Sequence, residues 1–131
     1  MHGTPKITAI DHLVLTVADI DVTCLFYEHI LGAQPIIFGE NRRALQIGQQ
    51  KINLHPRTNA FTPKAQNPTP GSADLCFLSE TPLAEWLAHF ETCGIEIIAG
   101  PVSRTGAMGP IESIYFYDPD GNLIEIARPA Y

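Results

Sequence analysis

The feature that most constrains the fold is an approximate internal repeat. Each half of the chain reads as a strand, a helix and then three short strands, with a proline-rich segment between the halves. At one constant spacing, His12 falls on Asp74, and the helix-ending Gly32 falls on Gly94. Because one such half is too small to bury a stable core, the two halves are expected to pack together.

The first half opens with a predicted strand over residues 7–17, which is rich in β-branched residues. A helix is expected to begin after the capping residue Asp19 and to end at Gly32. Residues 56–71 contain four prolines and a glycine, so they are predicted to connect the two halves. The three short strands before this connector are predicted at about 34–38, 43–48 and 50–55.

The second half repeats this order. A strand is predicted over residues 72–79, followed by a helix that Thr81 caps and Gly94 ends, with Pro82 in its first turn. The remaining segments are predicted to be a strand at about 95–98, a loop at 100–110 and strands at about 112–117 and 122–127.

Composition argues against several classes of function. The 131 residues carry a formal net charge of −6 with eight basic side chains, which argues against a nucleic-acid-binding surface. The apolar runs are too short for a membrane span, which needs about 20 apolar residues. The N-terminal residues lack the apolar core of a signal peptide, and the three cysteines show no CxxC spacing. We therefore expect a reducing, cytoplasmic location without nucleic-acid or membrane partners.

Polar side chains interrupt otherwise apolar strands at three informative positions. His12 lies early in the first strand, Asp74 takes the equivalent position in the second half, and Glu125 lies in the last strand. A carboxylate is costly to bury unpaired, so each needs water, a partner or a metal. An imidazole with two carboxylates suits a divalent metal and leaves coordination positions open for water or substrate. The alternative is that these side chains are solvated on a wet sheet face.

Other side chains are candidates for substrate binding or proton transfer. Asn53 is the repeat equivalent of Glu125. His55 lies two residues after Asn53, on the same strand face, and is a proton carrier, a further ligand or simply a histidine at the start of the loop. Cys76 lies between apolar residues and is expected to be a buried structural thiol. Arginine can hold a carboxylate or phosphate through two hydrogen bonds, unless it is simply solvated. The arginines expected to meet a ligand are Arg42, Arg43 and Arg104.

Both ends of the chain carry a resemblance to a known family. Residues 10–17 (IDHLVLTV) and 118–125 (DPDGNLIE) resemble the opening and closing segments of glyoxalase/bleomycin-resistance domains, the vicinal oxygen chelate superfamily. Within that superfamily, residues 100–111 and 53–55 are most similar to the glyoxalase domain-containing protein 5 group.

This resemblance implies one α+β domain over residues 1–131, built from two paired βαβββ modules at about 7–55 and 72–128. Their curved mixed sheets would form a metal-binding cleft. Homodimers are also implied, and the long connector would permit modules to exchange between chains. Asp74 stands where many members have histidine, and Asn53 stands where glyoxalase I enzymes have glutamate. The metal ligands implied by the resemblance are His12, Asp74 and Glu125, with Asn53 at the position of a fourth.

These inferences favour a metal-dependent lyase or isomerase, similar to lactoylglutathione lyase, whose small substrate chelates the metal through vicinal oxygens. The expected metal is Zn, Ni, Mn or Mg rather than Fe. Glu125, if it can leave the metal, or His55 would act as the base. The residues expected to bind substrate are Arg104, Asn53 and Arg43. Three alternatives stay open: an Fe(II) extradiol-type dioxygenase, a non-catalytic binding protein of the bleomycin-resistance type, and a transferase of the fosfomycin-resistance type.

Overall fold

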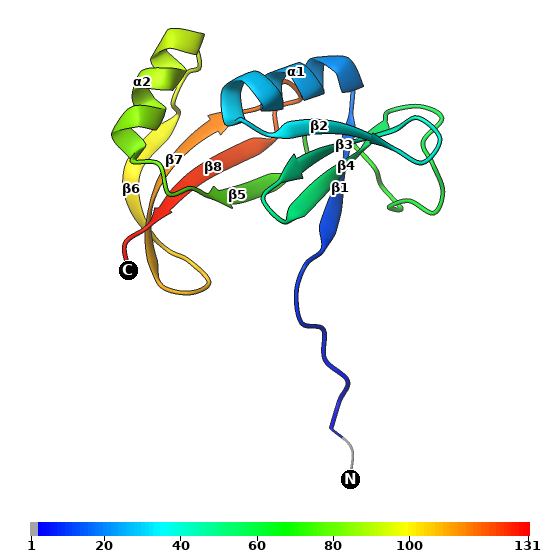
Figure 1. Ribbon diagram of the computed structural model, residues 1–131, viewed down its shortest axis with the longest axis horizontal. Helices are drawn as coiled ribbons and strands as arrows, with labels where there is room; N and C mark the ends of the chain where they lie inside the picture. The colour runs from blue at the N-terminus through cyan, green and yellow to red at the C-terminus, as the bar shows by residue number, and fades with distance from the viewer. Residues whose placement is uncertain (1–2) are drawn as a thin grey trace.

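The computed structural model describes residues 3–131, which form two four-stranded sheets with both helices on one side of them (Figure 1). The elements in chain order are β1 (His12–Val17), α1 (Ile20–Leu31), β2 (Gln34–Phe38), β3 (Arg42–Ile47), β4 (Gln50–Pro56), β5 (Asp74–Leu78), α2 (Leu83–Cys93), β6 (Ala99–Thr105), β7 (Pro110–Tyr117) and β8 (Leu123–Pro129). This is the predicted α+β fold. Neither helix in the described part of the chain is long and apolar enough to cross a membrane.

The two sheets have the same topology. Sheet A has the strand order β1-β4-β3-β2, and sheet B has the order β5-β8-β7-β6. In each sheet the first strand of the half pairs in parallel with the last strand, and the other neighbours are antiparallel. The internal repeat is therefore a repeat of topology, and β1 and β5 are both edge strands with one unpaired side.

The predicted capping residues define the helix ends, with one exception. Asp19 is the N-cap of α1, and its side chain accepts a hydrogen bond of 3.1 Å from a backbone N–H of the first turn. Gly32 (φ 70°) ends α1 and Gly94 (φ 73°) ends α2, in a conformation that glycine adopts without steric cost. At the start of α2, Pro82 rather than Thr81 is the N-cap, because its extended backbone delays the first helical residue.

Three of the predicted segments differ from the structure. Residues 7–11 are exposed chain without regular secondary structure rather than strand, because β1 begins its pairing with β4 only at His12. Residues 95–98 form no strand. Instead, β6 occupies residues 99–105, most of which the sequence predicts to be loop. Antiparallel pairing with β7 supplies the backbone partners that override the glycine and proline signals there.

The two halves share one core on the helix side of the sheets. The ring centroids of Phe90 (α2) and Phe116 (β7) are 4.8 Å apart, and that of Phe26 (α1) is 6.4 Å from Phe116. The hydroxyl of Tyr27 (α1) donates a 2.7 Å hydrogen bond to Asp118 Oδ2, and both residues are buried. Apolar contacts and a buried hydrogen bond thus join the halves, leaving the opposite sheet faces uncovered by helices.

Candidate functional site

Side chains alternate across each sheet, so each sheet has one face towards the helices and one away from them, here called the open face. The open face of sheet A carries Gln34, Ile36, Phe38, Arg42, Ala44, Gln46, His12, Val14, Thr16, Lys51, Asn53 and His55. The open face of sheet B carries Asp74, Cys76, Leu78, Arg104, Ser113, Tyr115, Glu125 and Ala127. All the predicted site residues except Arg43 therefore lie on an open face.

His12 lies at the start of edge strand β1, with its side chain partly exposed. Its Nδ1 is 2.8 Å from Asp11 Oδ2. Because a carboxylate only accepts hydrogen bonds, this contact places the proton of the neutral imidazole on Nδ1. The lone pair of Nε2 is then free, as in metal-binding histidines whose other nitrogen is held by a carboxylate.

Asn53 is the next open-face position towards the middle of sheet A, on β4 opposite Val14. It is only 6% exposed, and its Oδ1 has no hydrogen-bond partner among the residues that the structure describes. A buried amide oxygen without a partner is unfavourable. Asn53 Oδ1 is therefore an unsatisfied acceptor on the open face, and carbonyl oxygens are suitable ligands for hard divalent metals.

On sheet B, Glu125 lies on β8 between Cys76 of β5 and Tyr115 of β7, while Asp74 is exposed at the start of β5. Desolvation and then the negative charge of Glu125 raise the pKa of Cys76 to about 11. The thiol therefore stays protonated near neutral pH and is a poor nucleophile. The prediction that Cys76 is buried is wrong, because this residue faces the open side of an edge strand.

A cavity of about 420 Å³ lies over this part of sheet B, and its lining includes Glu125, Arg104 and Tyr115. Arg104 Nε donates a 2.9 Å hydrogen bond to the Tyr115 hydroxyl, which holds the guanidinium beside the cavity. Residues 105–107 complete the wall. The structure thus brings together two of the predicted site residues, a carboxylate and an arginine, beside one space large enough for a small molecule.

The three predicted metal ligands do not form one cluster within a chain. His12 lies on sheet A, whereas Asp74 and Glu125 lie on sheet B. Within residues 3–131, no group of three or more His, Cys, Asp or Glu side chains is placed to hold a metal ion. Each open face therefore presents only part of the predicted ligand set.

Arg42 and Arg43 point to opposite faces of sheet A. Arg43 Nη1 donates a 3.0 Å hydrogen bond to Asp21 of α1, so Arg43 is bound on the helix side and away from the other candidates. Arg42 Nη2 donates a 3.2 Å hydrogen bond to His55 Nε2 on the open face. Strand alternation in the sequence could have shown that Arg43 points away from the open face. The buried apolar Leu45 lies two residues after Arg43 and therefore shares its side of the sheet, which is the helix side.

The buried His55 imidazole should make stability depend on pH. Burial, and then the positive charges of Arg42 and Lys64, lower its pKa below the ordinary value of 6.5. The neutral His55 imidazole therefore contributes its full stability above about pH 6.5, and this contribution is lost as the pH falls through the folded-state pKa. We expect the free energy of unfolding, measured with urea, to fall between about pH 7 and pH 5 in the wild type and to fall less in His55→Gln.

The matched control is His29→Gln, which removes a histidine whose side chain is 69% exposed. This control should follow the wild type across the same pH range. If the free energy of unfolding falls equally in His55→Gln and in the wild type as the pH is lowered, His55 is not the group that causes the fall.

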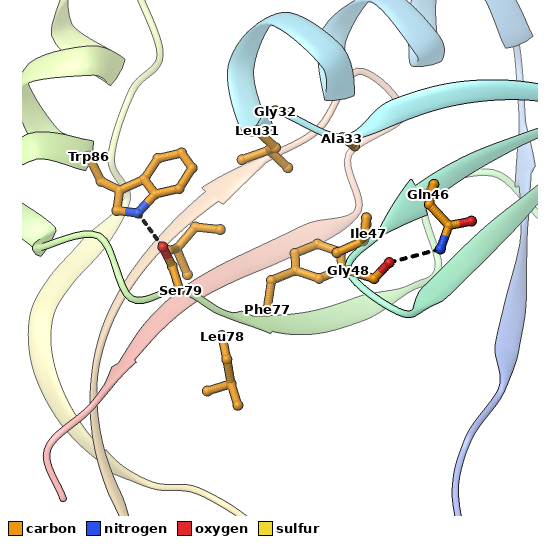
Figure 2. Close-up of a pocket in the computed structure, with 11 residues that line it drawn as sticks. Leu31, Gly32, Ala33, Gln46, Ile47, Gly48, Phe77, Leu78, Ser79 and Trp86 are labelled. Carbon is orange, nitrogen blue, oxygen red and sulfur yellow. Dashed lines mark hydrogen bonds between the residues drawn. The ribbon is translucent and has the colours of Figure 1, made fainter.

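A second cavity of about 240 Å³ lies where the two halves meet (Figure 2). Its walls are mostly apolar, and its polar side chains are already paired. Trp86 Nε1 donates to Ser79 Oγ at 2.9 Å, and Gln46 Nε2 donates to the Gly48 carbonyl at 2.9 Å. Because its lining contains no ionisable side chain, we place no chemistry there.

Comparison with known proteins identifies relatives over nearly the whole chain. The sequence matches the Glyoxalase/Bleomycin resistance protein/Dioxygenase superfamily over residues 9–126. It is 57% identical over 122 residues to virulence protein STM3117 of Salmonella typhimurium strain LT2, which covers 93% of this chain and 85% of that protein. The crystal structure of STM3117 matches with a TM-score of 0.92 and 56% identity, over 95% of this chain and 98% of that one.

Two further relatives extend the comparison. Glyoxalase domain-containing protein RDO1 of Mycosarcoma maydis is 50% identical over 122 residues, which are 93% of this chain and 69% of RDO1. The fosfomycin resistance protein FosX of Listeria monocytogenes, complexed with Mn(II) and sulfate, shares the fold with a TM-score of 0.67 and 21% identity, over 95% of this chain and 93% of that one. From the family match and these identities, the chain belongs to the glyoxalase/bleomycin resistance protein/dioxygenase superfamily.

Proposed function

We propose that this protein is a metal-dependent lyase or isomerase that acts on a small molecule with two vicinal oxygens. The supporting observation is that the two open faces carry complementary parts of one ligand set. His12 with its free Nε2 and Asn53 with its unpartnered Oδ1 lie on sheet A. Asp74 and Glu125 lie on sheet B. Closer membership in the glyoxalase domain-containing protein 5 group and a cytoplasmic location stay predictions.

Two copies of the chain, with sheet A of one facing sheet B of the other, would complete two such sites. The candidate ligands favour this pairing, because the open face of sheet A has His12 and Asn53 whereas that of sheet B has Asp74 and Glu125. The edge strands β1 and β5 also expose apolar side chains, with Val14 44% and Leu78 62% exposed. We therefore propose a homodimer with a shared site.

The chemistry of the donor set bears on the choice of metal. One imidazole, two carboxylates and an amide oxygen fit Zn, Ni, Mn or Mg. The set has a single histidine, which argues against the two-histidine, one-carboxylate pattern of Fe(II) oxygenases. The Mn(II) held by the structural relative FosX agrees with a metal of this class.

A divalent ion bound by these residues would polarise the two substrate oxygens and stabilise negative charge on them. Glu125 lines the cavity on sheet B. On leaving the metal, its carboxylate would remove a proton from a substrate carbon and return it. Arg104 on the same wall would orient a polar group of the substrate through its N–H donors. His55 is less suited to act as the base, because its Nε2 already accepts a hydrogen bond from Arg42.

Metal content is the direct test of this proposal. Protein purified without chelator or affinity-column metal should hold about one divalent ion per chain, measured by elemental analysis. His12→Ala and Glu125→Ala should lose this ion, because each removes a ligand. Glu112→Ala, which removes an exposed carboxylate from β7, is the matched control and should keep it. A wild type that stays metal-free after addition of Ni, Mn, Zn, Mg and Fe(II) would overturn the proposal.

A further inference from the structure

The open face of sheet A carries a cluster of basic side chains that has no negatively charged partner within residues 3–131. Arg42 and Lys51 lie on this face, on β3 and β4. Neither makes an ion pair with any residue in the described part of the chain. The four strands place no Asp or Glu on this face. The cluster is therefore a local region of positive charge in a chain whose formal net charge is −6.

Aromatic rings hold these cations in place. The Arg42 guanidinium carbon is 5.0 Å from the Phe38 ring centroid and 4.6 Å from the Phe61 ring centroid. Lys51 Nζ is 3.8 Å from the Phe38 centroid. Contact with the ring faces stabilises a cation without consuming its hydrogen-bond donors. Arg42 is therefore positioned by the rings, and these contacts use none of its N–H donors.

The hydrogen-bonding capacity of this cluster is only partly used. Arg42 has one side-chain hydrogen bond, from Nη2 to His55 Nε2 at 3.2 Å, and its Nε is buried without a partner in residues 3–131. A buried donor that loses its water and gains no acceptor is unfavourable. Beside it, His55 is 3% exposed and supplies no negative charge. The Nη1 group and the second N–H of Nη2 also make no hydrogen bond within residues 3–131. The surrounding positive charge favours an anionic acceptor for these donors.

We propose that Arg42 and Lys51 form a binding subsite for an oxyanion, which is a carboxylate, phosphate or phosphonate group. A guanidinium binds such a group through two parallel N–H···O hydrogen bonds, and the lysine ammonium adds a second positive charge. Phe61 from the connector contacts Arg42 and also lies against His55, with ring centroids 5.7 Å apart. This wall excludes water from one side of the guanidinium and strengthens its attraction to an anion.

The position of the subsite also indicates the class of substrate, and this step rests on the proposed function. Thr16 lies opposite His55, four residues along β1 from His12, which is roughly 13 Å at the rise of a β-strand. One end of a small molecule could then chelate the metal near His12 while its other end reaches Arg42. Lys51 is the strand partner of His12, but its ammonium reaches the Phe38 ring that Arg42 also contacts. The substrate is thus a small acid whose anionic group is held by Arg42 and the Lys51 ammonium, with its two vicinal oxygens towards His12.

Binding of inorganic phosphate, methylphosphonate and acetate to the metal-free protein at low salt tests the subsite. Proton–nitrogen NMR spectra would follow the arginine Nε–H signals and the Asn53 side-chain amide. We expect saturable shifts centred on Arg42, with affinity at least about tenfold lower in Arg42→Ala and in Lys51→Gln. Arg128→Ala removes an exposed arginine from β8 and should bind like the wild type. Tighter binding of acetate would assign a carboxylate, and tighter binding of phosphate or methylphosphonate would assign a phosphorus oxyanion.

Two results would overturn the subsite: no saturable shift with any of the three anions, or equal weakening in Arg42→Ala and Arg128→Ala. If Arg42→Ala fails to fold, Lys51→Gln provides the comparison, because the wild-type spectrum shows whether its fold is kept. The use of metal-free protein separates the two proposals. Anion binding in a protein that takes up no metal contradicts only the proposed function, and metal binding without anion binding contradicts only the subsite.

Discussion

Mixing His12→Ala chains with Glu125→Ala chains is expected to restore metal binding that neither variant has alone. His12 lies on sheet A and Glu125 on sheet B, and the proposed site takes one sheet from each copy. A mixed dimer then contains one site with both substitutions and one site with neither. Random pairing after joint unfolding and refolding makes about half of the dimers mixed, so about a quarter of all sites are intact. Metal content per chain should rise from near zero to about a quarter of the wild-type value.

A second mixture, of Asp74→Ala and Glu125→Ala chains, provides the control. Both substitutions lie on sheet B, so every site in every dimer contains one of the two substitutions and lacks one ligand. This mixture should stay metal-free. Metal uptake by the control, or its absence in verified mixed dimers of the first pair, would show that the site is not shared between copies in this way.

Asp118→Ala is expected to cause the largest loss of stability. Asp118 is 6% exposed, and its carboxylate accepts four hydrogen bonds, from the Asp120 and Asn122 backbone N–H groups, the Asn122 side chain and the Tyr27 hydroxyl, at 2.7–3.0 Å. The substitution leaves these donors unpaired in the interior. We expect a cost of about 3–5 kcal/mol, against a total stability of roughly 5–15 kcal/mol for a typical domain. Urea unfolding followed by circular dichroism would measure it.

Tyr27→Phe removes only one of these four hydrogen bonds and should cost about 1–2 kcal/mol. Burial, and then the charge of Asp118, raise the pKa of Tyr27 well above its ordinary value of 10. Its contribution is therefore complete below about pH 10 and is lost as the pH rises towards the folded-state pKa, so Tyr27→Phe should lose less stability in alkali. Tyr117→Phe, at a residue that is 54% exposed, is the control. A Tyr27→Phe variant as unstable as Asp118→Ala would contradict this account.

Local signals in the sequence predicted much of the fold. Asp19 caps α1, and Gly32 and Gly94 end the two helices, because capping and left-handed backbone conformations depend on one residue and its immediate neighbours. The strand at residues 99–105 could not be predicted in this way. Its glycine and proline indicate a loop, and only the pairing with β7, a contact from elsewhere in the chain, makes it a strand.

The candidate site also has one part that local sequence predicts and another that only the tertiary structure determines. The sequence by itself determined which residues interrupt apolar strands, and so His12, Asp74 and Glu125 could be chosen as candidate ligands. Tertiary structure alone decided that Arg43 binds α1 while Arg42 faces Phe61, since neighbouring strand residues point to opposite faces. It also decided that His12, Asp74 and Glu125 form no single cluster within residues 3–131. Alternation places a side chain on one face of its own strand, but the packing of distant elements determines what that face meets.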